Sequence, residues 1–454
     1  MTESTRELAR DARRAAHGDL AGIRRRQRTR LAGIVAYARA HSAYYRELYR
    51  DLPETVEDPA LLPVTDKRTL MTRFADWVTD PEVTMERVEA FAADPSLVGA
   101  PFLDRYLVAT TSGTSGLRGL FVLDERSLAV STALGARART GFGLGTSLRL
   151  LAHGARTAVV SAPAGHFFTV AVPARFQWER PRLGRIMKVF PIDRPMDELV
   201  EGLNRYDPGS IAGFLSMLTM LAAEREAGRL RIRPPVIIAG GETASPDALR
   251  RLADAFGATV RTSYACTECG FLSFSCAYGW YHVSADWAIA EPVDAEYRPV
   301  PPGQPSHTVL VTNLANRVQP ILRYDLGDSV RQRPDPCPCG SPFPAIQVRG
   351  RSADLLTFRT DGGARVSLSP MLFGTLLDGV PGVERYQLVQ TAPATLRVRL
   401  QAAADADTVW PRVRDALSGL LTEHKAGAIT LERAEEPPER SPGGKFRRII
   451  PLAE

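Results

Sequence analysis

The sequence predicts an α/β protein with a large N-terminal domain and a small α+β C-terminal domain. A chain of 454 residues is too long for one ordinary core, which indicates more than one domain. Short apolar runs alternate with helical patterns over residues 155–265, as expected for parallel-type sheets. After Gly350 the pattern changes into a compact strand-and-helix unit of a length that can fold alone. We therefore expect domains at residues 1–349 and 350–454.

The N-terminal segment predicts helices first. Over residues 3–50, apolar residues recur at spacings of three and four, which is typical of amphipathic helices. Thr65 or Asp66 is expected to cap a short helix that follows a turn. A strand over 106–110 then leads into a stretch of small residues, after which the chain returns to strand and helix.

The central and C-terminal elements follow from the same periodicities. The strand-like segments of the central region are 156–163, 186–192, 209–214 and 235–242. The helix-like segments between and after them are 197–206, 216–228 and 245–256. A strand at 307–314 and a turn favour an antiparallel, barrel-like subdomain over residues 280–333. After Gly350 we expect strands at 351–358, 384–390, 395–401 and 428–434, with helices near 369–377 and 408–424.

Composition narrows the class of protein. Hydrophobic residues make up 44% and charged residues 24%, the balance of a globular protein. With no run of about 18 apolar residues and no apolar signal segment, we expect a cytoplasmic protein without a membrane partner. The net charge is +6. One basic cluster alternates with apolar positions, which indicates the solvent-exposed face of a helix; it consists of Arg24, Arg25, Arg26 and Arg28. We therefore expect no nucleic-acid partner.

The first motif is a loop of Thr, Ser and Gly residues at 110–116. Glycines let backbone N–H groups approach a phosphate closely, and hydroxyl groups add further donors. The loop does not match the G-x-x-x-x-G-K-[ST] pattern of an ordinary P-loop. A flexible solvent loop has the same composition, so this motif by itself leaves both interpretations open.

Four further motifs follow along the chain. In residues 264–268 an aromatic ring could stack on a base, a threonine could bind a phosphate, and a glutamate could hold Mg²⁺. In residues 323–328 an aspartate after a glycine could accept hydrogen bonds from two ribose hydroxyls, although a simple β-turn has the same pattern. Residues 350–354 form the fourth motif, and a lysine within the glycine loop of 442–447 forms the fifth.

The order of these five motifs resembles that of the ANL superfamily of acyl-CoA synthetases, adenylation domains and luciferases. The resemblance covers nearly the whole chain. The segments that resemble the phenylacetate-CoA ligase subgroup are 41–49, 62–71, 238–242 and 443–449. The resemblance implies that ATP activates a carboxylic acid to an acyl-AMP, which then passes to CoA. It also implies that the small C-terminal domain is mobile.

The resemblance implies a role for each residue of the nucleotide site. Those expected to wrap the β- and γ-phosphates are Thr111, Ser112, Gly113, Thr114, Ser115 and Gly116. Those expected on the adenine side are Gly240, Gly241, Glu242 and Tyr264. Asp328 would hold the ribose hydroxyls, with Arg351 at the ribose or phosphate. Thr267 would contact the α-phosphate and Glu268 would bind Mg²⁺. Lys445 would bridge the attacking carboxylate and the α-phosphate.

The sequence departs from the family pattern at two places. Ala353 stands where the family commonly has Asp or Lys, and Leu117-Arg118 stands where the phosphate loop usually has a trailing lysine. These departures leave open which acceptor takes the acyl group from the acyl-AMP. The acceptor is CoA or, alternatively, an amine, nitrite or a carrier-protein thiol. An inactive nucleotide-binding scaffold is a third reading, against which the retained Glu268, Asp328 and Lys445 argue.

The cysteines indicate a metal site rather than disulfides. There are five, an odd number. Cys276, His282, Cys337 and Cys339 supply four soft or borderline ligands in two clusters, as tetrahedral structural zinc requires. Several proteins of the resembled subgroup carry a comparable site. Buried free thiols beside a surface histidine are the alternative, and Cys266 and Cys269 could replace some of these ligands.

The acid-binding pocket is implied by the family resemblance. Its expected residues are His166, Phe167, Phe168, Phe214, Met217 and Ala239. Aromatic and methionine side chains suit a flat aryl acid, although ordinary core packing explains each of them nearly as well. The expected partners are therefore a small aryl acid and CoA or another small nucleophile. The oligomeric state is left open, with a homodimer as one option.

Overall fold

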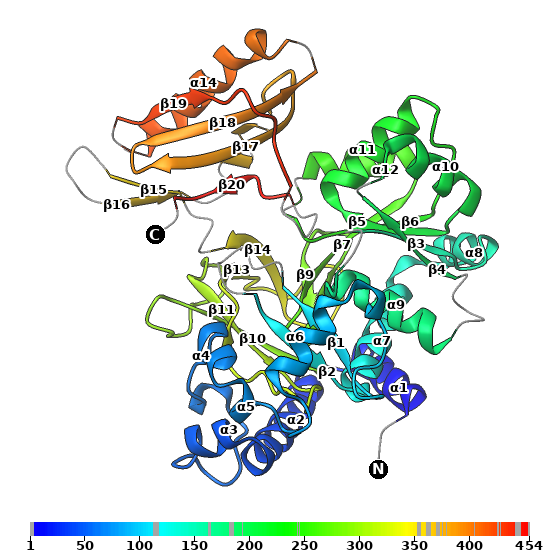
Figure 1. Ribbon diagram of the computed structural model, residues 1–454, viewed down its shortest axis with the longest axis vertical. Helices are drawn as coiled ribbons and strands as arrows, with labels where there is room; N and C mark the ends of the chain where they lie inside the picture. Colours follow the sequence, from blue (N-terminus) through cyan, green and yellow to red (C-terminus); the bar gives the residue numbers. More distant parts are fainter. Residues whose placement is uncertain are drawn as a thin grey trace.

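The computed structural model describes residues 4–111, 118–161, 165–180, 186–192, 194–242, 244, 246–351, 356–359, 365–368, 373–374, 376–377, 379–403, 405–424, 426, 428–440 and 446–452. Figure 1 shows the N-terminal helices at one end of the molecule and the C-terminal unit at the other, with the large sheet between them.

The predicted N-terminal helices are confirmed, and each begins at a capping side chain. The first three are α1 (Thr5–Ala16), α2 (Leu20–His41) and α3 (Ala43–Leu48). Their N-caps are Ser4, Asp19 and Ser42. Asp66 rather than Thr65 caps α4, because the Asp66 carboxylate accepts a hydrogen bond from the Thr69 N–H at 2.9 Å. The remaining elements here are η1 (Pro59–Leu61), α4 (Lys67–Thr72), α5 (Phe74–Trp77), α6 (Met85–Ala93), η2 (Pro95–Leu97), β1 (Leu107–Thr110) and β2 (Leu120–Leu123).

A nine-stranded sheet forms the centre of the molecule, in the order β13-β14-β9-β8-β7-β6-β5-β3-β4. Its parallel half consists of β3 (Thr157–Ser161), β4 (Met187–Pro191), β5 (Ser210–Phe214), β6 (Val236–Gly240) and β7 (Thr259–Cys266). The helices of this region are α7 (Glu125–Arg139), η3 (Thr140–Phe142), α8 (Leu144–Ala152), α9 (Phe168–Glu179), α10 (Met196–Tyr206), α11 (Leu215–Glu226) and α12 (Pro246–Phe256). Apolar residues of α10, α11 and α12 form one core with β3, β5 and β6. The parallel α/β packing expected from the alternating pattern is thus confirmed.

The antiparallel half continues the same sheet. It contains β8 (Gly270–Ser275), β9 (Tyr281–Val283), β13 (Asp328–Gln332) and β14 (Ala345–Arg351). A separate three-stranded antiparallel sheet contains β10 (Ala288–Val293), β11 (Thr308–Asn313) and β12 (Tyr324–Asp325). Both sheets are open in the part of the chain that the structure describes, so the barrel-like subdomain is an open antiparallel arrangement there.

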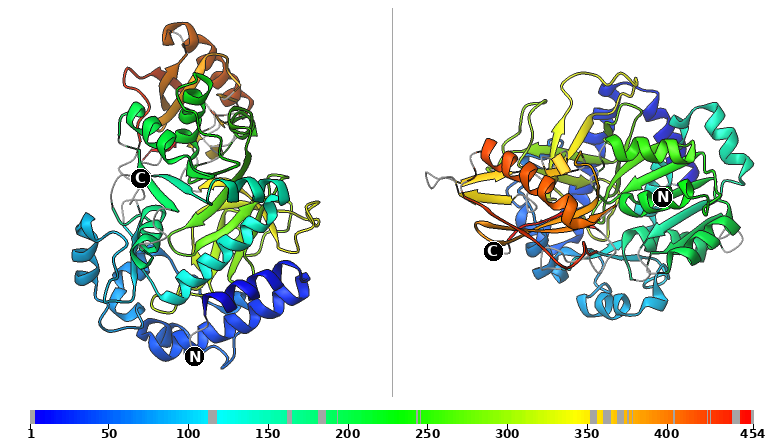
Figure 2. Two further views of the ribbon diagram at one scale, coloured as in Figure 1. Left: turned by 90° about the vertical axis from the view of Figure 1, so that its right-hand side faces the viewer. Right: turned by 90° about the horizontal axis from the view of Figure 1, so that it is seen from above.

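The C-terminal unit has its own hydrophobic core. It contains β15 (Leu356–Arg359), β16 (Arg365–Leu368), β17 (Val383–Ala392), β18 (Thr395–Ala402), α14 (Ala406–Glu423), β19 (Thr430–Arg433) and β20 (Ile449–Ile450). The order of its main sheet is β19-β18-β17-β20. Figure 1 shows this unit beyond the large sheet, and the left view of Figure 2 shows it at the same end of the molecule. Residues 352–355 and 369–372, where a strand and a helix were expected to begin, lie outside the described residues.

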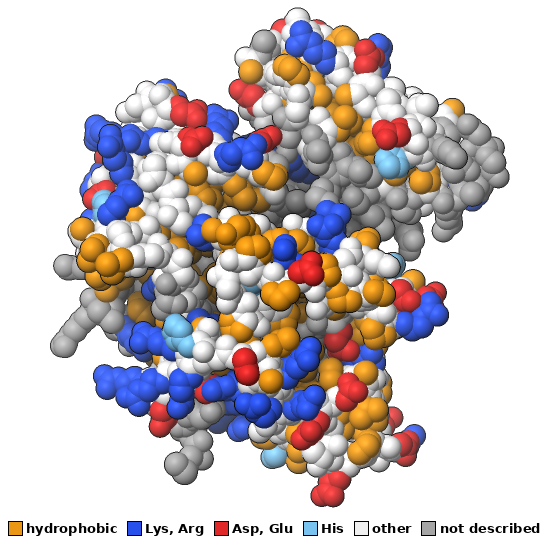
Figure 3. Space-filling model, turned by 180° about the vertical axis from the view of Figure 1, so that it is seen from behind, with side chains coloured by type: hydrophobic (Ala, Val, Ile, Leu, Met, Phe, Trp, Pro, Cys, Tyr) orange, Lys and Arg blue, Asp and Glu red, His pale blue; other side chains and the backbone are white. Residues whose placement is uncertain are grey.

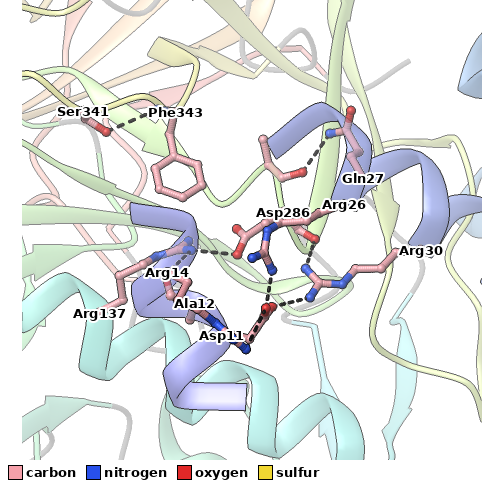
Figure 4. A network of polar contacts seen from close by, with 11 residues as sticks. Asp11, Ala12, Arg14, Arg26, Gln27, Arg30, Arg137, Asp286, Ser341 and Phe343 are labelled. Carbon is pink, nitrogen blue, oxygen red and sulfur yellow. Dashed lines mark hydrogen bonds and ion pairs between the residues drawn. The ribbon is translucent and has the colours of Figure 1, made fainter. Parts of the chain in front are cut away.

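A polar network joins the N-terminal helices to the central region (Figure 4). Arg26 and Arg30 of α2 both pair with Asp11 of α1, and Arg137 of α7 pairs with Asp286 at 2.8 Å. Burial acts to raise the pKa of Asp11, but the hydrogen bonds from the two arginines outweigh it and the pKa is lowered. Arg26 is therefore a packed ion-pair residue, whereas Arg24, Arg25 and Arg28 are exposed as expected.

Basic side chains form groups on the rear face of the molecule. Seen from behind in Figure 3, Lys and Arg side chains form a band across the lower part of the molecule. Among the helices that the structure describes, none is long and apolar enough to cross a membrane.

Candidate active site

Three neighbouring parallel strands end at the same edge of the large sheet, and two of them, β6 and β7, lead into predicted nucleotide segments. Phe214 at the end of β5 is paired with Gly240 at the end of β6, and Gly240 is paired with Ser263 of β7. The residues that follow these strands therefore leave the sheet side by side. In open α/β sheets the carboxyl ends of the strands form the usual ligand-binding edge.

The turn between β7 and β8 carries Thr267 and Glu268. The Glu268 side chain is buried, and it accepts a hydrogen bond from the Tyr324 hydroxyl at 3.2 Å. The Asn313 side-chain amide donates to the Glu268 backbone carbonyl at 3.1 Å. Burial, together with the nearby Glu268 charge, raises the pKa of Tyr324, so its hydroxyl stays protonated and donates. The carboxylate is thus held in a fixed direction, as a metal-binding group requires.

The residues expected at the adenine and ribose lie close together. The Tyr264 hydroxyl donates a hydrogen bond to the Asp328 carboxylate at 2.7 Å. Asp328 begins β13, and its backbone partner in the sheet is Arg351 at the end of β14. The structure therefore brings together three residues from motifs that are far apart in the sequence, although it describes only the backbone of Arg351.

Glu242 is the second residue after the end of β6, and its side chain is almost fully buried. Its carboxylate accepts hydrogen bonds from the Ser216 N–H at 2.7 Å, the Ser216 hydroxyl at 2.9 Å and the Phe446 N–H at 3.1 Å. Gly241 has φ +74°, and a Cβ there would lie 2.8 Å from the Phe214 ring. Only glycine fits this position without strain, and it directs Glu242 towards helix α11.

The structure describes the two ends of the predicted phosphate-binding loop. The Thr111 N–H donates to the Gly119 carbonyl at 3.0 Å, and the Gly119 N–H donates to the Thr111 hydroxyl at 2.8 Å. These bonds hold the two ends of the loop together. The other predicted residues of this loop, Ser112, Gly113, Thr114, Ser115 and Gly116, lie outside the described residues, as do Lys445 and Ala353.

The six residues expected in the acid pocket divide into two groups. Met217 and Ala239 belong to the core between the sheet and its helices. Phe168 belongs to a smaller core under β1, and its ring lies 3.3 Å from the position of a Cβ on Gly270. Phe214 covers Gly241 at the strand ends, and half-buried Phe167 forms a bridge with Thr110. Phe214 therefore packs on a residue of the predicted adenine side, and Phe167 pairs with the first residue of the predicted phosphate loop.

His166 is fully buried beneath β1. Its Nε2 lies 3.2 Å from the Asp94 carbonyl oxygen, and its ring is tilted against Phe91 with the ring centroids 5.4 Å apart. Burial lowers the pKa of His166, although hydrogen bonds to backbone carbonyls oppose the shift. Its backbone carbonyl also accepts from the Thr110 N–H. These contacts hold the segment before Phe167 against the end of β1.

The four predicted metal ligands come together at one point. The ligand atoms of Cys276, His282, Cys337 and Cys339 all lie within 4.8 Å of one another. The Cys276 and Cys337 sulfurs are 3.7 Å apart, and the Cys339 sulfur is 3.2 Å from Nε2 of His282. Zinc bound at about 2.3 Å from sulfur and about 2.0 Å from nitrogen places tetrahedral ligands roughly 3.5–3.8 Å apart. The donor set therefore fits tetrahedral zinc, with the Cys276–Cys337 distance in this range and all four ligand atoms within 4.8 Å.

Neighbouring backbone groups and strands hold the four predicted ligands in place. Nδ1 of His282 lies 3.0 Å from the Phe343 carbonyl oxygen, which leaves Nε2 to face the three sulfurs. Cys276 follows β8, His282 lies on β9, and the other two cysteines lie between β13 and β14. The cluster therefore connects two separate hairpins of the antiparallel half. Neither Cys266 nor Cys269 belongs to it.

Sequence reasoning missed several residues that hold the site. Tyr324 lies within the predicted motif at 323–328, but only Asp328 received a role there. Ser216 and Asn313 lie outside all five motifs, and Arg440, whose guanidinium lies 4.0 Å from the Glu242 carboxylate, belongs to the C-terminal unit. Tyr324 could have been found from the motif itself, whereas the other contacts join distant segments and leave no local signal.

The chain shares its α/β fold with solved CoA ligases. A 2-hydroxyisobutyryl-CoA ligase in the postadenylation state, in complex with R3-HIB-AMP, matches with a TM-score of 0.68 and 21% identity, covering 94% of this chain and 89% of the ligase. An anthranilate CoA ligase in complex with anthranoyl-AMP matches with a TM-score of 0.54 and 16% identity, covering 75% and 65%. ATP-bound MatB from Rhodopseudomonas palustris matches with a TM-score of 0.50 and 18% identity, covering 75% and 66%. No protein-family model and no curated protein matches the sequence.

Proposed function

We propose that this protein uses ATP to convert a carboxylic acid into an acyl-AMP and then transfers the acyl group to CoA. One observation carries the proposal: two predicted nucleotide motifs, 264–268 and 323–328, are joined by two hydrogen bonds, from Tyr264 to Asp328 and from Tyr324 to Glu268. The fold supports it, because solved CoA ligases with acyl-AMP share the same architecture.

The proposed reaction has two balanced steps. In the first, a carboxylate oxygen of the acid bonds to the α-phosphorus of ATP, the bond from that phosphorus to the bridging oxygen breaks, and pyrophosphate leaves. In the second, the CoA sulfur bonds to the acyl carbon, AMP leaves, and the thiol proton is released to solvent. Such transfers depend mainly on positioning and on neutralising charge.

We assign the residues as follows. Tyr264 packs against the adenine, with Gly240 and Gly241 beside it. Asp328 accepts hydrogen bonds from the ribose hydroxyls, and Arg351 lies at the ribose or phosphate. Thr267 contacts the α-phosphate, Glu268 holds Mg²⁺, which neutralises phosphate charge when bound, and Lys445 bridges the reacting oxygens. The loop from Thr111 to Gly116 binds the β- and γ-phosphates.

The acid and the acceptor are finer parts of the proposal. Phe167 and Phe214 near the strand ends favour a flat aryl acid, with His166, Phe168, Met217 and Ala239 shaping the wall behind them. CoA is the proposed acceptor. An amine, nitrite or a carrier-protein thiol is the alternative on the same scaffold, because Ala353 replaces the usual polar residue at the hinge.

We also propose a boundary at residues 349–350 and a structural zinc ion. The separate core of the C-terminal unit supports the boundary. The zinc would be held by Cys276, His282, Cys337 and Cys339, and would fix the β8–β9 hairpin to the segment between β13 and β14.

The experiment that tests the function is pyrophosphate exchange into ATP across a library of aryl and aliphatic acids, followed by addition of CoA. We expect exchange that depends on one class of acid, and a CoA thioester detected by mass spectrometry. Product formation with an amine, nitrite or a carrier protein, and none with CoA, would show that the acyl group passes to that acceptor in the second step. No exchange with any acid would support an inactive nucleotide-binding scaffold.

A further inference from the structure

The Glu242 carboxylate has a second set of contacts besides those with the large domain. Its side chain is only 7% exposed, and a buried carboxylate must be matched by donors. From the large domain, Ser216 supplies its N–H and hydroxyl. Ser216 is the second residue of α11, so Glu242 satisfies a backbone donor at the start of this helix and lies at the positive end of its dipole.

The other contacts of Glu242 come from the C-terminal unit. The Phe446 N–H donates to Oε1 at 3.1 Å, and a guanidinium nitrogen of Arg440 lies 4.0 Å from the same oxygen. Arg440 and Phe446 themselves form an antiparallel bridge. Arg440 and Phe446, which have five residues between them in the sequence, thus contact the same carboxylate of the large domain.

The C-terminal unit holds these two residues firmly on its own side. Buried Gln387 of β17 donates to the Glu439 carbonyl at 3.1 Å and to the Arg447 carbonyl at 2.8 Å. These carbonyls belong to the residues just outside the Arg440–Phe446 bridge. The Arg385 guanidinium also lies 5.4 Å from the centroid of the Phe446 ring. The segments that contact Glu242 are therefore hydrogen-bonded to the sheet of the C-terminal unit.

We infer that Glu242 is a positioning residue, which aligns the C-terminal unit on the large domain for the adenylation step through Phe446 and Arg440. The inference rests on the proposed function, because Phe446 directly follows Lys445 and its N–H belongs to the peptide group that joins the two residues. It gives Glu242 a role different from the adenine contact implied by the family resemblance. A positioning role affects the rate of adenylation, whereas an adenine contact affects the binding of ATP.

Three variants of the full chain test this role. Glu242→Gln is isosteric, but a single amide oxygen cannot accept from all three donors. Arg440→Gln removes the ion pair from the C-terminal side and leaves the contact with α11 intact, so it serves if Glu242→Gln fails to fold. Ser216→Ala is the matched control, because it removes one donor to Glu242 without touching Phe446 or Arg440.

Two measurements separate the outcomes. The first is amide hydrogen exchange at Phe446 in the absence of ligands, which we expect to be about ten-fold faster in Glu242→Gln and unchanged in Ser216→Ala. The second is acid-dependent pyrophosphate exchange, in which we expect kcat to fall about ten-fold in Glu242→Gln and Arg440→Gln. We expect the Kd for ATP, measured by calorimetry with ATP alone, to stay within about two-fold in both.

Several results would overturn the inference. One is equal protection of the Phe446 amide in the wild type and in Glu242→Gln. Another is exposure of that amide with unchanged kcat. A third is a rise in the Kd for ATP with unchanged kcat, which would return Glu242 to an adenine contact. If the wild type itself shows no exchange with any acid, the proposed function fails, and the exchange of the Phe446 amide still tests the contact.

Discussion

The Tyr264 hydroxyl donates a 2.7 Å hydrogen bond to the Asp328 carboxylate. This bond connects the last residues of β7 with the first residue of β13, which lie at distant positions in the nine-stranded sheet. It fixes the carboxylate that we assign to the ribose against the ring that we assign to the adenine. The two nucleoside contacts therefore act as one preformed unit.

Replacing Tyr264 by phenylalanine tests this unit. The ring remains, but Asp328 loses a hydrogen bond worth about 1 kcal/mol. We expect the Kd for ATP, measured by calorimetry, to rise about five-fold. Tyr297→Phe is the matched control, because its hydroxyl donates to Asp325 and not to Asp328. Equal ATP affinity in the wild type and Tyr264→Phe would contradict the proposed role of the bond.

Tyr324→Phe tests the role of Glu268. The change removes the hydroxyl that directs this carboxylate and leaves the contact from Asn313 in place. Loss of a group that orients a metal ligand typically lowers metal affinity 10–100-fold, so we expect the half-saturating Mg²⁺ concentration in pyrophosphate exchange to rise about ten-fold. If the Mg²⁺ dependence is unchanged while activity persists, Glu268 does not hold the metal.

The proposed zinc site predicts a defined metal content. Protein purified without chelator should contain about one zinc ion per chain by mass spectrometry of the metal, as a four-ligand structural site requires. Cys337→Ser should lose most of this zinc and unfold at a lower temperature, because binding of a structural metal contributes to folding. Cys269→Ser, which lies outside the cluster, should keep it. Wild-type protein that contains no zinc would refute the site.

Glu291 predicts a pH dependence of stability. Burial raises the pKa of Glu291 to about 7, although the Arg323 charge opposes the shift. The folded protein then binds more protons here than the unfolded chain does, so the free energy of unfolding falls as pH rises from about 4.5 towards 7. Across that window the loss from this group is about 3 kcal/mol.

The matched variant for this prediction is Glu291→Gln. Urea unfolding of both proteins at pH 5 and pH 8 should show a smaller decline in the free energy of unfolding for the variant. Other titrating groups are common to both proteins and cancel in the difference. Parallel declines would mean that Glu291 titrates near its ordinary value.

Local patterns predict the elements of this fold because each carries its own periodicity and caps. Helix α10 begins and ends within a residue of the segment expected from its apolar spacing, and Asp66 was one of two expected caps. The antiparallel region over residues 280–333 was harder to predict, because short strands do not reveal whether a sheet closes. In the described residues its strands are divided between the nine-stranded sheet and a separate three-stranded sheet, and both sheets are open.

The candidate site could be predicted from the sequence only where its residues belong to short, continuous motifs. Thr267, Glu268 and Asp328 follow from short patterns, and the spacing of Cys276 and His282 indicated metal ligands. The hydrogen bonds of Glu242 could not be predicted, because its donors Ser216 and Phe446 come from segments that only the folded chain brings together. Arg26 illustrates the same limit, since its ion pair with Asp11 depends on how α1 packs on α2.

Acid-dependent pyrophosphate exchange in the wild type and in Lys445→Ala tests the central claim most directly. We expect exchange in the wild type with at least one acid, and a loss of two to three decades in the variant, about 3–4 kcal/mol of transition-state stabilisation. We expect ATP binding to be largely retained, because we assign the lysine to the reacting atoms rather than to the nucleoside. Equal exchange rates in the two proteins would contradict the account.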